Sequence, residues 1–89
     1  MKIVKVTWID AEEYGEIGWN SLKSMKTYAK KPCPTMTSVG HVLYEDDNHI
    51  SLISTVGEKE SSSVDKIPKS FINKIEELTE KVNEKDALL

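Results

Sequence analysis

The residue types that could carry out covalent catalysis are scarce in this chain. Cys33 is its only thiol, and His41 and His49 are its only imidazole bases. A Cys–His pair requires contact in space, and Cys33 lies between two prolines with no supporting motif around it. We therefore interpret Cys33 as an incidental loop thiol, and we expect a protein that is not an enzyme.

Two histidines and two aspartates, His41, His49, Asp46 and Asp47, offer the ligand types of a metal site. The aspartates lie at the expected tip of a hairpin, and His41 precedes them along a strand that carries its side chain too far away. Asp favours turns because it hydrogen-bonds to its own backbone, so turn residues are the better interpretation. The sequence has no CxxC or HExxH spacing and no glycine-rich phosphate loop. We expect no metal and no cofactor.

Residues suited to binding are more plentiful. Lysines between positions 23 and 31 could meet phosphates, although a solvated helix face is the ordinary explanation for such a cluster. Trp8 and Trp19 could stack on purine bases, or they could simply belong to the core. Residues 35–55 include several Ser and Thr side chains, whose hydroxyls would either form hydrogen bonds to a ligand in a pocket or lie on an exposed sheet surface. The sequence leaves these alternatives open.

Composition limits the class of partner. The chain has 89 residues, 38% apolar and 30% charged, as expected of one globular domain. Its net charge is −3 and every basic residue is Lys, which argues against binding to double-stranded DNA because Arg is the usual reader of guanine edges. The single cysteine fits a reducing cytosol. No apolar run approaches the roughly 20 residues of a membrane span, and the first residues are too polar for a signal peptide.

The first third of the chain predicts a strand and a helix. Residues 2–10 alternate and place Val4, Val6 and Trp8 on one inward face of a strand. Residues 11–18 contain two glycines and predict a loop. A helix is expected over about 20–31, capped by Asn20 or Ser21 and ended by the prolines that follow. One face of that helix carries apolar residues at three-residue spacing, namely Trp19, Leu22, Met25 and Tyr28.

The remainder predicts mainly strands. Residues 36–45 and 49–57 are rich in β-forming residues and are joined by Asp46-Asp47-Asn48, which is typical of a hairpin turn. Gly40 within the first run indicates a bulge or a sharp bend. A short strand over 64–67 and a 3₁₀ turn after Pro68 should follow. Residues 72–78 fit either a helix or a closing strand, and residues 79–89 fit a polar helix or a frayed tail.

Taken in order, these elements predict a mainly β domain over residues 1–78 with one inserted helix. The order resembles that of a small five-stranded SH3-like or Sm-like barrel, in which closure removes the exposed sheet edges. Because the chain is short and its helix has an apolar face, we also expect a homo-oligomer.

Four segments together resemble a family of small phage proteins: TWIDA (7–11), GWNSL (18–22), TSVGHVLYEDDNHISLIST (37–55) and IPKSFINKIEEL (67–78). The shared pattern is a W-x-D strand, Gly-Trp before a helix, T-x-V-G before an acidic hairpin tip, and a closing Ile-Pro-basic turn followed by Ile-Glu-Glu-Leu. Each motif is short and none is catalytic, so the resemblance depends on their order. The position of His41 is often aromatic in that family, and this chain departs from it there.

The family resembles phage proteins that counter the CBASS defence by sequestering its cyclic nucleotide messenger. The resemblance implies binding, without cleavage, of a cyclic dinucleotide such as cyclic GMP-AMP in the host cytoplasm, which would serve immune evasion. An SH3-like or Sm-like module that binds a host protein or single-stranded RNA is the alternative. We predict a ligand site beside the helix-bearing loop and the central hairpin, formed by Trp8, Trp19, Thr37, Ser38, His41, Ser54, Thr55 and Lys69. The tryptophans would stack, the hydroxyls would bond phosphates or base edges, His41 would stack or hydrogen-bond, and Lys69 would supply charge.

Overall fold

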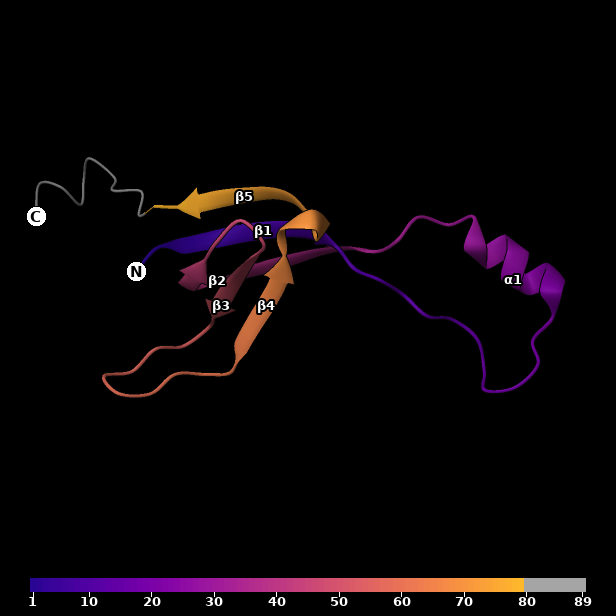
Figure 1. The fold of residues 1–89 in the computed structure, drawn as a ribbon, viewed down its shortest axis with the longest axis horizontal. Helices are drawn as coiled ribbons and strands as arrows, with labels where there is room; N and C mark the ends of the chain where they lie inside the picture. Colours follow the sequence, from indigo (N-terminus) through magenta and orange to yellow (C-terminus); the bar gives the residue numbers. More distant parts are fainter. Residues whose placement is uncertain (80–89) are drawn as a thin grey trace, which may run out of the picture.

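The computed structural model describes residues 1–79, so the predicted C-terminal helix or tail lies, from residue 80 on, outside the described residues. The elements in chain order are β1 (Ile3–Ile9), α1 (Leu22–Ala29), β2 (Thr35–Glu45), β3 (His49–Ile53), β4 (Val64–Pro68), the 3₁₀ helix η1 (Lys69–Phe71) and β5 (Ile72–Leu78). The prediction of a mainly β fold with one inserted helix is therefore confirmed (Figure 1). Of the two alternatives for residues 72–78, the strand is correct.

All five strands belong to one antiparallel sheet in the order β4-β3-β2-β1-β5. β2 pairs with β1 from Thr35 to His41 and with β3 from His41 to Glu45, so this one long strand joins the two halves of the sheet. Within residues 1–79 the outer strands β4 and β5 are not paired with each other. The sheet is therefore open, and the predicted barrel closure is not confirmed.

The core lies on one face of this sheet. Val4 and Val6 alternate inward from β1 as predicted, and they join Ile50, Leu52 and Ile67 in one buried cluster. Half-buried side chains complete the cluster, namely Trp8, Val42, Ile72 and Ile75. Each fully buried aliphatic side chain of this kind stabilises the fold by about 1.5–3 kcal/mol relative to its exposed state.

Gly40 allows β2 and β3 to approach each other closely. A Cβ atom at this position would lie 2.9 Å from the backbone oxygen of Ile53 and 3.3 Å from the Cβ of Leu52. The first distance is shorter than real Cβ contacts. Gly40 is thus a position where a side chain is excluded, and the β2–β3 pairing depends on it. The irregularity that the sequence predicted at Gly40 lies further along β2, between Val42 and Tyr44.

Residues 10–34 form an extension that we call the arm. The arm leaves the sheet after β1, forms α1 and returns to β2, and Figure 1 shows α1 standing well apart from the strands. The helix is shorter than predicted. Ser21 caps it, because the Ser21 side chain accepts a hydrogen bond from the N–H of Ser24, and it ends at Ala29 before the two prolines. None of its residues is buried.

The close approach at Gly40 makes the effect of a methyl group there predictable. We expect Gly40→Ala to lower the free energy of unfolding by about 1–3 kcal/mol, since β3 must move to admit it. The matched control is Gly57→Ala, where the added Cβ would lie at an ordinary 3.4 Å from its nearest neighbour, the backbone oxygen of Glu60. That change should stay within about 0.5 kcal/mol. Urea unfolding measures both, and equal effects would contradict the steric explanation.

Candidate functional site

The eight predicted site residues do not converge on one pocket. Trp8 and Ser38 lie on the core side of the β1–β2 pair, because Val6 is directly opposite Ser38. Thr37 and His41 alternate to the opposite side of β2. The others lie elsewhere: Ser54 and Thr55 directly after β3, Lys69 in η1, and Trp19 in the arm.

Trp8 and Ser38 are the one pair in this set that the fold brings into contact. The Trp8 indole Nε1–H donates a hydrogen bond to the Ser38 hydroxyl oxygen at 3.0 Å. Both side chains are half-buried, and they line a depression of about 300 Å³ together with residues 64–67 of β4. The indole also packs against the core cluster, so Trp8 has a structural role whether or not it contacts a ligand.

Ser54 and Thr55 contribute to the loop that joins β3 to β4. The Ser62 hydroxyl oxygen lies 3.1 Å from the backbone N–H groups of Ser54 and Thr55, and accepts from both. The hydroxyl groups of Ser54 and Ser62 are also 3.1 Å apart. This loop is therefore organised by its own serines. Lys69 is similarly engaged, since its ammonium group forms an ion pair with the Glu45 carboxylate.

Asp46 is a turn residue, as the sequence predicts. Its carboxylate accepts hydrogen bonds from the N–H groups of Asn48 at 2.8 Å and His49 at 2.9 Å, which closes the β2–β3 hairpin. These backbone bonds hold the pKa of Asp46 below its ordinary value, that from His49 contributing most. The Tyr44 hydroxyl also donates to this carboxylate, which raises the pKa of Tyr44. Among residues 1–79, no group of three or more His, Cys, Asp or Glu side chains is placed to hold a metal ion.

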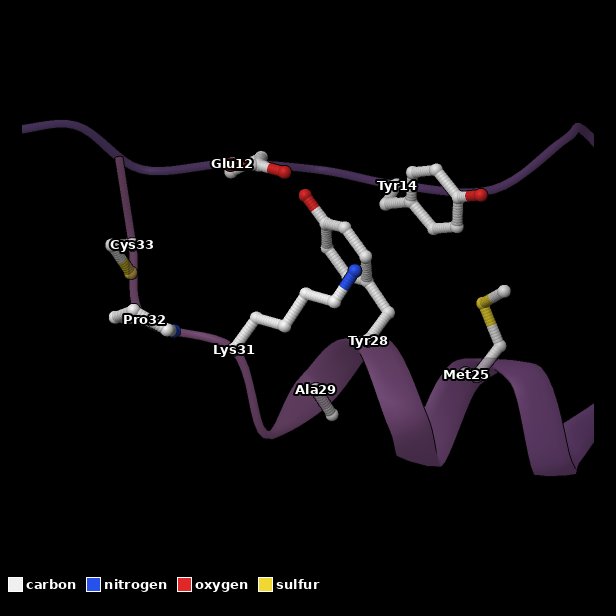
Figure 2. Close-up of a pocket in the computed structure, with 8 residues that line it drawn as sticks. All are labelled: Glu12, Tyr14, Met25, Tyr28, Ala29, Lys31, Pro32 and Cys33. Atoms are coloured by element: carbon white, nitrogen blue, oxygen red, sulfur yellow. The ribbon is translucent and has the colours of Figure 1, made fainter. Parts of the chain in front are cut away.

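A set of side chains that the sequence did not single out meets on the arm. The rings of Tyr14 and Tyr28 stack with their centroids 4.0 Å apart and 14° between their planes. The Lys31 ammonium lies 5.7 Å from the centroid of the Tyr28 ring, within reach of a cation–π interaction. Figure 2 shows Tyr28 rising from α1, and Lys31 from the coil that follows it, toward the segment that carries Tyr14.

The Tyr14–Tyr28 pair separates two hollows of different chemistry. The hollow in Figure 2, about 300 Å³, is edged by the Glu12 carboxylate and includes Met25, Cys33 and the half-buried helix face. The other hollow, about 480 Å³, contains no acidic residue and is lined by Tyr14, Lys23, Ser24, Thr27, Tyr28 and Lys31. We call the second one the lysine hollow. It combines an aromatic pair, hydroxyls and two cations, which suits an aromatic anion.

Helical spacing explains how the lysine hollow forms. Lys23 and Thr27 are four residues apart and lie in one row along α1, and Lys31 follows four residues later, just after the helix has ended. Tyr14 is brought to this row by the loop before α1, where Gly15 and Gly18 adopt positive φ angles of 124° and 106°. The Asn20 side chain fastens that loop by accepting from the Glu16 N–H and donating to the Glu16 carbonyl, both at 3.0 Å. The lysine row is visible in the sequence, but no periodicity links Tyr14 to Tyr28.

Comparison with known proteins gives no relative: the chain matches no family model, no curated protein and no solved structure. Within residues 1–79, the structure has no helix of the length and apolar character that crossing a membrane would require.

The Trp8–Ser38 hydrogen bond can be tested by a double-mutant cycle. Ser38→Ala leaves a half-buried indole N–H without its acceptor, and we expect a loss of about 1 kcal/mol in unfolding free energy. In a Trp8→Phe background, which lacks that donor, the same substitution should cost markedly less. Thr37→Ser, on the opposite side of β2, is the control and should be near neutral. Strictly additive effects of Ser38→Ala and Trp8→Phe would show that the bond contributes nothing.

Proposed function

We propose that the protein binds and sequesters a small anionic nucleotide of the cyclic dinucleotide class, such as cyclic GMP-AMP, without cleaving it. The observation that carries the proposal is the lysine hollow, where Lys23 and Lys31 flank the stacked Tyr14 and Tyr28 rings. A cyclic dinucleotide has two phosphates and two bases. A site for it needs cations and aromatic faces at short separation, with no nucleophile or general base.

Electrostatics favour the lysine hollow over its neighbour. Residues 22–31 contain four lysines and no acidic residue, and two of the lysines border the hollow directly. Lys31 lines the hollow in Figure 2 as well, but there the Glu12 carboxylate offsets its charge and repels a phosphate, and Lys23 is absent. A ligand phosphate is therefore placed between Lys23 and Lys31, and the Ser24 hydroxyl lies in the same lining to donate a hydrogen bond.

The aromatic pair supplies the platform for a base. Two stacked tyrosines present outer faces on which a purine extends an existing column, and such stacking is worth about 1–3 kcal/mol per base. This placement differs from the one predicted from the sequence, in which Trp8 or Trp19 stacks. The indole N–H of Trp8 already donates a hydrogen bond to Ser38, and Trp19 is not among the residues that line the lysine hollow.

The bent five-stranded sheet serves in this proposal as an SH3-like, partly open barrel that carries the arm. The strand order, the long insertion between β1 and β2, and the 3₁₀ helix between β4 and β5 support that interpretation. The sheet provides the stable anchor, and the arm provides the binding surface.

The test is to incubate the protein with a panel of cyclic dinucleotides and measure affinity by calorimetry. Tyr28→Ala should weaken binding by roughly 5- to 150-fold, the equivalent of one lost stack. Lys23→Ala and Lys31→Ala should each weaken it and reduce its salt dependence, since each removes a cation facing phosphate. Lys59→Ala, on the exposed β3–β4 loop, is the matched charge control and should bind as the parent does.

Two further outcomes decide between the alternatives. If Trp19→Ala weakens binding while Tyr28→Ala does not, the ligand lies at the site predicted from the sequence. Heat denaturation of the complex should release the ligand unchanged, and Cys33→Ser should leave binding intact. Release of a cleaved ligand would show that the protein is an enzyme, and no retention of any cyclic dinucleotide would reject the proposal.

A further inference from the structure

The arm leaves a group of large apolar side chains uncovered. Ile17 and Trp19 have exposed fractions of 107% and 103%, and Leu22 follows at 68%. We call these three residues the arm tip. Every residue from 11 to 24 is exposed, so the sheet covers none of this stretch. A single exposed side chain is ordinary, but three large apolar side chains within the six residues 17–22 of a projecting segment suggest an interaction site.

Ordering the arm costs conformational entropy, and few contacts within the arm offset that cost. Fixing a backbone costs roughly 1–2 kcal/mol per residue, and α1 buries no residue in return. The contacts that do hold the arm are the Tyr14–Tyr28 stack and the hydrogen bonds around Asn20. A partner that covers the arm tip would supply the missing burial.

The same chain carries a hollow that matches the arm tip. It measures about 410 Å³ and lies on β2, β3 and β4, lined by Leu43, Tyr44, His49, Ser51, Val64 and Lys66. We call it the sheet hollow. The apolar part of its lining is accessible to a binding partner, since Leu43, Tyr44 and Val64 have exposed fractions of 49%, 55% and 41%.

Charge also matches between the two surfaces. Leu22 and Lys26 are one turn apart on α1, so a cation adjoins the arm tip. This row is turned by about 100° from the one that contains Lys23. The lining of the sheet hollow contains Lys66, and the hollow lies beside the β2–β3 turn, which carries Asp46 and Asp47. The charge match is therefore confined to the edge of the hollow next to this turn, where the lysine of the arm would meet the two aspartates.

We propose that the arm tip of one copy docks in the sheet hollow of a second copy, and that the reciprocal contact forms a closed two-fold dimer. Both halves of the interface reside on one chain, so a two-fold axis uses each of them twice. Trp19 buries about 150–250 Å² by itself. With Ile17, Leu22 and the matching hollow surface, doubled by symmetry, the total reaches on the order of 1,500 Å², the size of a stable specific interface.

This inference goes beyond the nucleotide proposal and does not depend on it. The dimer contact uses the arm tip and the row containing Lys26, whereas the ligand contact uses the row containing Lys23 and Lys31. Failure of one can therefore be told from failure of the other.

The first experiment measures mass by light scattering and sedimentation, without ligand, over 1–100 µM. The parent should be a dimer, and Trp19→Ala should weaken association at least about 30-fold, as expected for a buried tryptophan anchor. Because Trp19 is fully exposed within the chain, the variant should remain folded, which far-UV circular dichroism checks. Val56→Ala, an exposed apolar residue on the β3–β4 loop, is the matched control and should stay dimeric. A monomeric parent, or a dimer unaffected by Trp19→Ala, would overturn the proposal.

The second experiment identifies the partner surface. Leu43→Lys should also be monomeric, because it places a charge in the sheet hollow while leaving the arm intact. Mixed with Trp19→Ala, it should associate more strongly than either variant does with itself. In the mixed pair one of the two contacts is intact, because the unchanged arm of the Leu43→Lys chain meets the unchanged hollow of the Trp19→Ala chain. Charge reversal by Lys26→Glu should weaken the dimer, and adding Asp47→Lys should recover part of the loss. A dimer that responds to Trp19→Ala but shows neither recovery would place the arm tip on some other surface and refute the docking proposed here.

Discussion

Burial of a single apolar face of the five-stranded sheet is the interaction on which the rest of the structure depends. Val4 and Val6 from β1 must meet Ile50 and Leu52 from β3, although β2 lies between these strands in the sheet. This contact requires β2 to pair with both β1 and β3, and it requires β3 to lie close against β2. Gly40 permits this approach, since a side chain there would meet the Ile53 carbonyl at 2.9 Å.

The molecule has two parts that are stabilised differently: the sheet, which contains the core, and the arm, which lies outside it. The strands hold their shape through burial and ladder hydrogen bonds, and polar side chains such as Ser62 and Asp46 fasten their connections. The arm holds its shape through surface contacts alone, chiefly the Tyr14–Tyr28 stack. Our proposals place recognition on the arm, the part of the molecule with the least burial, as is common for binding segments mounted on a rigid scaffold.

Charge separation within the arm gives its two sides different partners. The lysine row containing Lys23 and Lys31 borders a hollow free of acidic residues, and the apolar arm tip lies next to Lys26 on another row. In our proposals the first side takes a phosphate-bearing ligand and the second takes the acid-edged sheet hollow of a second copy. A dimer formed in this way would place the arms, and the ligand sites they carry, in fixed positions relative to the sheets.

The sequence by itself determined those features that depend on neighbours along the chain. Alternation in residues 2–10 identified β1 and its inward face, and the Asp46–Asn48 segment identified the hairpin turn. Only the tertiary structure decided which faces are covered. Trp8 and Trp19 have the same side chain, yet one is bonded to Ser38 thirty residues away and the other is fully exposed. Periodicity reports which residues share a face, but not what that face meets, because the meeting depends on contacts between distant segments. For that reason the Tyr14–Tyr28 stack and the open sheet edges could not be foreseen. The first four strands and the helix could be, whereas residues 72–78 fitted a helix as well as the strand that they form.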